Sequence, residues 1–168
     1  ELTGLPAGGF SSIGIGIPGM VDSVSGQVAH AVNLGVESLA LGGELAGRLG
    51  VGVRVENDVK AAALGAFHLL GLDGSMAYLN LGTGMAAGIV VDGRLWRGAT
   101  GVAGEIGHLP VDPAGALCRC GQRGCLETVA SGSGVARQWR TDDPLPARAL
   151  FAAAADGDRE ARAIAARL

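Results

Sequence analysis

The chain has 168 residues, and its 30 glycines and 28 alanines far outnumber its six aromatic residues. Because 48% of the residues are hydrophobic and only 17% are charged, the composition excludes a disordered segment. It also excludes collagen, since the glycines follow no three-residue period, and a membrane span, since no run approaches about 20 apolar residues. The net charge of −3, with cations spread along the chain, argues against a nucleic-acid-binding surface. We therefore expect a compact cytoplasmic protein that binds neither membrane nor nucleic acid through this segment.

Extended and helical patterns follow one another in the first part of the chain. Isoleucines alternate with glycines from Ile13 to Ile17, which predicts a strand with one bulky and one bare face. An apolar stripe from Asp58 to Leu70 predicts a helix that Asn57 or Asp58 caps. The other predicted elements here are a turn over 22–26, a strand over 28–32, a weak helix over 39–49 and a strand over 51–55.

The second part begins after a turn at residues 71–75, which is the best candidate for an internal boundary. Residues 76–81 predict a strand, and Asp92-Gly93 between two apolar runs predicts a β-hairpin over 87–97. The remaining expectations are a loop over 98–107, a helix over 126–139, a break over 141–146, and two helical stretches within 149–168 separated at 156–158.

The most specific motif is H-x9-C-x-C-x4-C, formed by His108, Cys118, Cys120 and Cys125. Three thiols and one imidazole supply a Cys₃His ligand set for tetrahedral Zn²⁺. The alternatives are three free thiols, or one disulfide and an odd thiol, although a disulfide within Cys-x-Cys would be strained. We expect zinc in a structural role, because four protein ligands leave no open position for water.

Asp58 stands where a predicted strand meets a predicted helix. Carboxylates in this position most often cap the helix and do nothing more. If Asn57 takes the cap, Asp58 is free to act as a general base for phosphoryl transfer to a sugar or alcohol hydroxyl. Glu105, His108 and Glu127 lie in or beside the cysteine motif. Each alone is typical of a solvated surface group, whereas together with Asn57 and Asp58 they form a candidate set for binding hydroxyl groups.

Gly82, Thr83 and Gly84 join a predicted strand to the hairpin. Backbone N–H groups and a hydroxyl at such a turn can hold phosphate oxygens, although an ordinary tight turn explains the pattern as well. The segment matches neither the P-loop nor the Rossmann fingerprint, because no Gly-Lys-Ser/Thr follows and the next element is a strand.

Five segments follow one another along the chain: GIGIPGMVD (14–22), VNLG (32–35), ENDVKAAALGA (56–66), LGTGMAAGIVVDG (81–93) and GEIGHLPVDPAGALCRCGQRGCLETVASG (104–132). Their order resembles that seen in the ROK family of repressors, open reading frames and sugar kinases, and the resemblance covers residues 13–139. The resemblance implies an α/β, actin-like ATPase (ribonuclease H-like) fold with ATP and sugar bound between two lobes. Residues 1–72 would be part of the N-terminal lobe, and 73–168 part of the C-terminal lobe with a zinc-binding loop at 108–125.

The resemblance also implies roles for the candidate residues. Asp58 resembles the catalytic base that takes a proton from the sugar hydroxyl, and is itself expected to bind the sugar. Asn57, Glu105, His108 and Glu127 resemble the other sugar-hydroxyl ligands. His108 would hold zinc with one ring nitrogen and face the sugar with the other, so that zinc orders the sugar site without performing chemistry.

For ATP, the resemblance implies that Gly82, Thr83 and Gly84 form the second phosphate-binding loop and that Mg²⁺ arrives with the nucleotide. The family's first phosphate loop, Asp-x-Gly-Gly-Thr, is absent, and the chain starts at Glu1 with neither Met nor a signal peptide. We therefore expect a piece of a longer protein that is inactive by itself. Lys60 also departs from the pattern, because kinases of the family usually carry Asn there.

Two functions compete at this point. The leading hypothesis is an ATP-dependent hexose kinase of glucokinase type. The alternative is the sugar-sensing effector domain of a transcriptional repressor, whose helix-turn-helix would precede Glu1. In either case the expected partners are a small sugar and further copies of the chain, as a homodimer or higher homo-oligomer.

Overall fold

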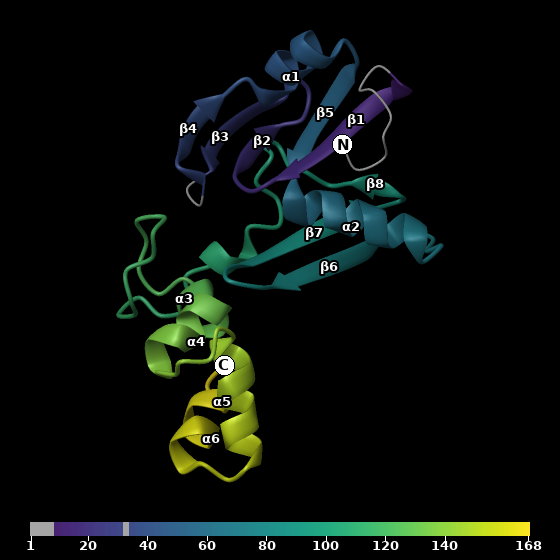
Figure 1. Cartoon of the computed structure of the whole chain (residues 1–168). Coiled ribbons are helices and arrows are strands. Elements are labelled where there is room, and N and C mark those ends of the chain that lie inside the picture. Colours follow the sequence, from purple (N-terminus) through teal and green to yellow (C-terminus); the bar gives the residue numbers. More distant parts are fainter. Residues whose placement is uncertain (1–8, 32–33) are drawn as a thin grey trace. The chain divides into compact units, whose positions relative to one another are not determined.

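The structure is a computed structural model, and it describes residues 9–31 and 34–168 (Figure 1). The chain divides into two compact units. The first runs up to Tyr78 and takes in Gly88–Gly104, and the second consists of Leu79–Ala87 and Glu105–Leu168. Because the chain passes between the units more than once, the predicted lobes 1–72 and 73–168 differ from these units in their limits.

The first unit contains a parallel strand pair and an antiparallel sheet. β1 (Ser12–Ile17) pairs in parallel with β5 (Gly52–Asn57), which aligns Ile17 with Asn57. β2 (Met20–Asp22), β3 (Gln27–Ala31) and β4 (Val36–Leu39) form the antiparallel sheet, and α1 (Leu41–Leu49) follows it. Val28, Ala31 and Val55 are fully buried and form one core of this unit.

Helix α2 (Asp58–Leu69) follows β5 directly and brings the chain to a second sheet. That sheet has the strand order β6 (Met76–Leu81), β7 (Met85–Val91), β8 (Arg94–Leu95). Ala63 and Phe67 of α2 pack with Val90 of β7 in a second core. Gly88 is required here, because a Cβ at that position would collide with the Cβ of Ala63.

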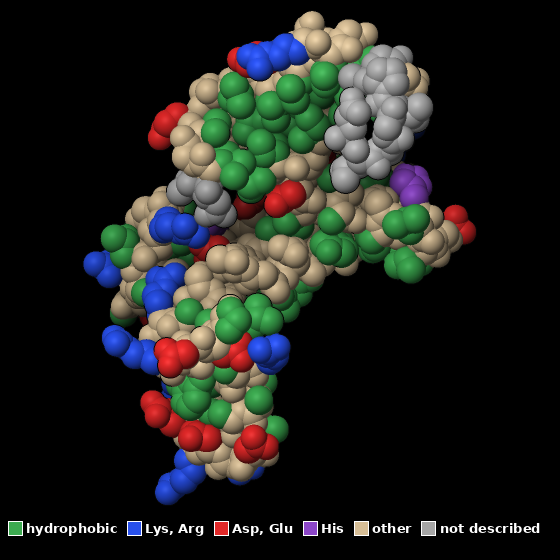
Figure 2. All heavy atoms as spheres, viewed as in Figure 1, with side chains coloured by type: hydrophobic (Ala, Val, Ile, Leu, Met, Phe, Trp, Pro, Cys, Tyr) green, Lys and Arg blue, Asp and Glu red, His purple; other side chains and the backbone are tan. Residues whose placement is uncertain are grey.

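The second unit is mainly helical beyond the cysteine motif (Figure 1). A single 3-10 turn (Ile106–His108) precedes the motif, and α3 (Glu127–Ala130), α4 (Gly132–Gln138), α5 (Pro146–Ala155) and α6 (Arg159–Ala165) follow it. Their core consists of Val135, Leu150, Ala161 and Ile164. On the face shown in Figure 2, acidic and basic side chains are interspersed over these helices.

Most of the predicted elements are present, with shifted limits. The hairpin is confirmed, because Asp92 and Gly93 turn with φ of 47° and 73° between the paired Val91 and Arg94. The single helix predicted over 126–139 is wrong, since extended backbone at Ser131 divides it into α3 and α4. The weak helix begins at Leu41, because Leu39 belongs to β4.

Strands β2 and β4 were not expected from the sequence. Among the described residues, no helix is long and apolar enough to cross a membrane. Three predictions reach outside the described residues. Glu1 begins the predicted N-terminal lobe, Val32 ends the strand predicted over 28–32, and residues 32–33 begin the quoted VNLG segment.

Candidate functional site

The four motif residues in the second unit bring their ligand atoms together. Sγ of Cys118 lies 3.6 Å from Nδ1 of His108, and Sγ of Cys120 lies 3.5 Å from Sγ of Cys125. All four ligand atoms lie within 4.8 Å of one another. A tetrahedral ion with Zn–S and Zn–N bonds of about 2.3 and 2.0 Å separates its ligand atoms by roughly 3.5 to 3.8 Å. The residues therefore fit a possible Cys/His metal site.

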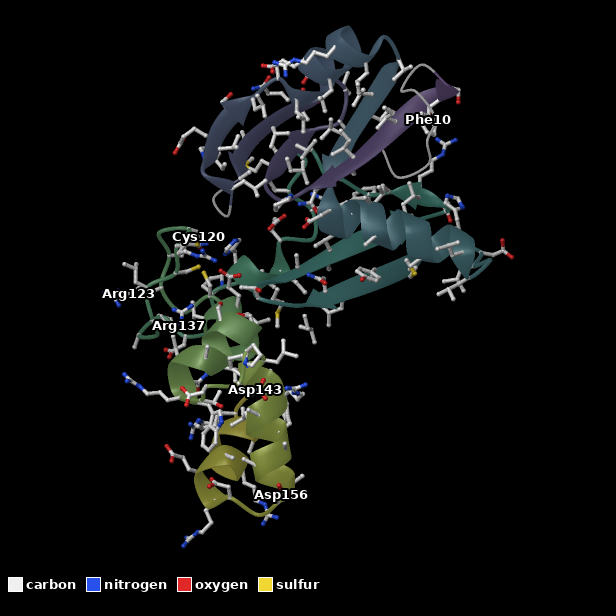
Figure 3. The ribbon with its side chains drawn as sticks, in the orientation of Figure 1. Phe10, Cys120, Arg123, Arg137, Asp143 and Asp156 are labelled. Atoms are coloured by element: carbon white, nitrogen blue, oxygen red, sulfur yellow. The ribbon has the colours of Figure 1, made fainter. Side chains whose placement is uncertain are left out.

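Backbone contacts fold the cysteine loop back on itself. The Cys118 N–H donates to the Gln122 carbonyl over 2.8 Å, and the Gly121 N–H donates to the Cys118 carbonyl over 3.0 Å. Gly124, with φ of 65°, lies so close to the Asp112 carbonyl that no side chain fits there. The loop is thus closed around the thiols, and Figure 3 shows Cys120 within it.

The three thiols have free sulfurs in different surroundings. Burial raises the pKa of Cys125 to about 12 and also raises the pKa of Cys118. Cys120 is exposed, and hydrogen bonds from the backbone and side chain of Gln122 lower its pKa to about 6. Thiolates are the ligands of metal ions, and a bound cation offsets the cost of burying them. The donor set therefore suits a cation.

Glu127 lies beside this cluster. Its Oε1 accepts a hydrogen bond from Cys118 Sγ over 3.3 Å and lies 3.7 Å from Nδ1 of His108. A Cβ on Gly84 would stand only 3.2 Å from Oε2 of Glu127. The structure thus brings one predicted sugar ligand between the cysteine cluster and the glycine loop. Glu105 begins the 3-10 turn, and its carbonyl accepts the His108 N–H over 3.1 Å.

The glycine loop 82–84 is attached to the start of α4. The Gly132 N–H donates to the Gly82 carbonyl over 2.9 Å, and the Ser133 N–H donates to the Thr83 carbonyl over 3.1 Å. Within the loop, the Gly82 N–H donates to the Gly84 carbonyl over 3.0 Å. The loop carbonyls are therefore engaged by protein groups, and this fixes the course of the turn.

Asn57 and Asp58 stand together in the first unit, and the structure resolves which of them caps α2. Oδ1 of Asn57 accepts the N–H groups of Val59 and Lys60, each over 3.1 Å, and its Nδ2 donates to the Gly19 carbonyl over 3.2 Å. Asp58 is exposed, and its Oδ1 accepts the Val59 N–H over 2.9 Å. Because Asn57 serves as the cap, the carboxylate of Asp58 is presented at the surface of the first turn.

Sequence reasoning missed two contacts close to Asp58. Glu56 forms an ion pair with Arg97, with Nη2 of Arg97 2.6 Å from Oε2 of Glu56. The ammonium of Lys60 donates to the Gly101 carbonyl. Both partners are 41 residues away in the chain. No local spacing pattern signals such pairs.

The described residues combine an α/β architecture with an exposed Asp at the start of a helix and a Cys₃His cluster beside a glycine loop. The ROK family model matches residues 6–168, and the chain belongs to this family.

The chain is similar to relatives with different names. The chain is 45% identical over 128 residues to a glucokinase of Halalkalibacterium halodurans, and this match covers 74% of this chain and 39% of that protein. It is 39% identical over 125 residues to a xylose repressor of Caldicellulosiruptor bescii, and this match covers 73% of this chain and 31% of that protein. The structure of a ROK glucokinase from Streptomyces griseus in complex with glucose and AMPPNP matches with a TM-score of 0.76 and 32% identity, over 92% of this chain and 56% of that one. The chain thus spans less than half the length of these two curated relatives.

Proposed function

We propose that this chain is part of an ATP-dependent, cytoplasmic hexose kinase of glucokinase type. The proposal rests on one observation at the start of α2. Asn57 caps the helix, and Asp58 presents an exposed carboxylate. Although Oδ1 of Asp58 accepts the Val59 N–H, the carboxylate is exposed, and we infer that it is available to a substrate hydroxyl. The 45% identity to a glucokinase supports the same conclusion.

In the proposed reaction, Asp58 accepts the proton of the attacking sugar hydroxyl. The hydroxyl oxygen forms a bond to the γ-phosphorus of ATP while the bond to the β,γ-bridging oxygen breaks, and ADP leaves. Asn57, Glu105, His108 and Glu127 bind the other hydroxyl groups and orient the sugar. The Gly82 N–H already donates to the Gly84 carbonyl, so the N–H groups of Thr83 and Gly84 and the Thr83 hydroxyl would hold phosphate oxygens. Mg²⁺ enters with ATP.

Zinc is the proposed ion of the cysteine cluster, held by His108, Cys118, Cys120 and Cys125. It would supply positive charge that keeps the buried thiols deprotonated and fixes the imidazole. Glu127 lies against Cys118 and close to His108, so an ordered cluster holds this proposed sugar ligand in place.

The test is hexose-dependent ADP release by the full-length protein, with Asp58→Asn as the decisive variant. Removal of a general base lowers kcat by about 10² to 10⁴, whereas sugar affinity changes little because the amide still forms hydrogen bonds. Asp73→Asn, in the exposed turn after α2, is the matched control and should retain full activity. Absence of turnover by the wild type on every hexose and acylamino-hexose, or full activity of Asp58→Asn, would refute the proposal.

The second candidate is the sugar-sensing effector domain of a repressor. It is favoured by the 39% identity to a xylose repressor over nearly the same length as the glucokinase match. A sensor keeps the hydroxyl ligands and has no use for a base. Sugar binding measured by calorimetry, without ADP release and with little loss in Asp58→Asn, would identify this function in place of the kinase.

A further inference from the structure

The three sulfurs of the cysteine cluster differ in their contacts. Sγ of Cys120 lies 3.5 Å from Sγ of Cys125. Sγ of Cys118 instead contacts a carboxylate and an imidazole, at 3.3 Å from Oε1 of Glu127 and 3.6 Å from Nδ1 of His108. All of these residues belong to the second unit. Two sulfurs of the cluster therefore contact each other, while the third is engaged by other side chains.

The two sulfurs of this pair also differ in their access to solvent. Cys120 is exposed on the loop (Figure 3), whereas Cys125 is fully buried. The side-chain amide of Gln122 donates to Sγ of Cys120 over 3.4 Å and to the His108 carbonyl over 3.3 Å. A reagent that arrives from solvent thus meets the Cys120 sulfur first, and the Cys125 sulfur is in contact with the atom that has reacted.

The loop between the two cysteines is able to bring their sulfurs into bonding distance. A disulfide holds its sulfurs about 2.05 Å apart, so the gap of 3.5 Å must close by roughly 1.5 Å. A Cβ at Gly121 would meet no atom within 4 Å, which leaves open space beside Cys120 for this movement. Gly124, by contrast, lies against the Asp112 carbonyl and keeps Cys125 in its place. The exposed cysteine can therefore move toward the buried one.

We propose that Cys120 and Cys125 are an oxidisable pair, which a hydroperoxide joins in a disulfide with loss of the metal. The inference rests on the proposed zinc site and does not depend on phosphoryl transfer. After oxidation only His108 and Cys118 remain as ligands, and a structural zinc site needs four. The pair thus makes the metal site sensitive to oxidants.

The chemistry takes two steps, and a hydroperoxide is its only co-reactant. With hydrogen peroxide, the Cys120 thiolate attacks one oxygen, the O–O bond breaks, hydroxide leaves, and Cys120 becomes a sulfenic acid. The Cys125 sulfur then attacks the Cys120 sulfur, the S–O bond breaks, and a second hydroxide leaves. The two sulfurs together lose two electrons, which reduce the peroxide, and the hydroxides take up protons to become water. A dithiol reverses the reaction by thiol–disulfide exchange.

Three cysteines that are merely close in sequence predict a different product. One residue separates Cys118 from Cys120, four separate Cys120 from Cys125, and all three thiols lie within eight residues. If spacing alone decides the pairing, the folded protein and the urea-unfolded protein give the same mixture of disulfides. If the fold decides it, the folded protein gives the Cys120–Cys125 disulfide, and the unfolded protein gives a mixture.

The experiment treats the full-length protein, purified without chelator, with hydrogen peroxide in modest molar excess, in buffer and in urea. Trypsin cleaves after Arg119 and Arg123, which places the three cysteines on three different peptides. Each possible disulfide therefore joins a distinct pair of peptides, which mass spectrometry of the alkylated digest identifies. A chromogenic chelator measures the released metal. We expect the Cys120–Cys125 disulfide in buffer, with about one Zn²⁺ released per disulfide as a four-ligand site requires.

Two variants assign the roles of the sulfurs. Cys125→Ala removes the thiol that resolves the sulfenic acid, so Cys120 should accumulate in that form, and dimedone should label it. Cys118→Ser is the matched control, because it also removes one metal ligand but keeps both sulfurs of the pair, and it should form the same disulfide. A difference between the two variants then reports the pair and not the loss of a ligand.

The peptide map decides the inference. A disulfide through Cys118, the same mixture in buffer and in urea, or thiols that stay reduced would overturn it, and so would loss of the disulfide in Cys118→Ser. Untreated protein without bound metal would refute the zinc assignment. In that case the Cys120–Cys125 disulfide still supports the oxidisable pair, and any other pairing overturns it. Activity on sugars enters none of these outcomes, so failure of the proposed kinase is recognised separately.

Discussion

Asn57 makes three side-chain hydrogen bonds at the junction of β5 and α2, and its removal should be measurable as lost stability. Its Oδ1 caps two N–H groups, and its Nδ2 binds the Gly19 carbonyl. We expect Asn57→Ala to lower the free energy of unfolding by about 1–2 kcal/mol, and Asn57→Ser to lower it less because a hydroxyl still caps the helix. Urea unfolding of both variants tests this. Equal losses would show that the cap contributes little.

At the same junction, the sequence identified Asn57 and Asp58 as candidates but could not show which of them caps α2. Asn57 and Asp58 both carry a side-chain oxygen that can cap a helix, and they are adjacent. The choice depends on the backbone, which is extended at Asn57 with φ of −60° and ψ of 140°, and on the Gly19 carbonyl. Both depend on the parallel pairing of β1 with β5, which is a tertiary contact. For the same reason the partner of Lys60 could not be predicted.

At the scale of elements, the segment from Cys125 to Ser133 connects the cysteine cluster to the glycine loop. The Thr128 hydroxyl donates to the Cys125 carbonyl over 2.7 Å, and the Ser131 hydroxyl donates to the Glu127 carbonyl over 2.7 Å. The Gly132 N–H then donates to the Gly82 carbonyl. Every link is a short hydrogen bond within one unit. Disorder of the cluster should therefore reach the 82–84 loop.

Metal removal tests this connection. Protein purified without chelator should contain about one Zn²⁺ per chain, as expected for a four-ligand site, and removal of the metal should accelerate amide exchange at Gly132 and Ser133 about tenfold or more. Amides of the β1–β5 pair, which belong to the first unit, serve as the internal reference. Absence of bound metal would count against the zinc assignment, and unchanged exchange at Gly132 would contradict the proposed connection.

Elements with strong local signals were predicted well, and those that depend on tertiary pairing were not. The Asp92-Gly93 turn gave the hairpin, because few other residue pairs adopt two successive positive φ values. β2 and β4 contain three and four residues, and they are extended because they pair with β3. Their sequences are too short to show the alternating hydrophobic pattern that predicts a strand. The break at Ser131 was missed because a serine within a helical pattern looks unremarkable until its side chain is seen to cap α4.

At the scale of the whole molecule, small residues limit how large each core can be. Among the residues that the structure describes, the first unit has two cores, built around Val28 and Phe67, and the second has one, built around Leu150. Alanine contributes to all three, at Ala31, Ala63 and Ala161. Alanine buries little apolar area, so the few larger side chains carry a large share of the stability. Leu150, which is fully buried, is the clearest case.

Leu150→Ala should therefore lower the stability of the helical core by about 2–5 kcal/mol, the usual cost of removing a buried leucine side chain. Phe151 is its neighbour on α5 but is 53% exposed, so Phe151→Ala is the matched control and should change stability by no more than about 0.5 kcal/mol. Trp139 packs against this core, and in a Trp96→Phe background its fluorescence reports unfolding of the helical core during urea titration. Equal midpoints for the two alanine variants would show that Leu150 does not hold this core together. A large shift for Leu150→Ala alone would confirm that α4, α5 and α6 depend on one leucine for their packing.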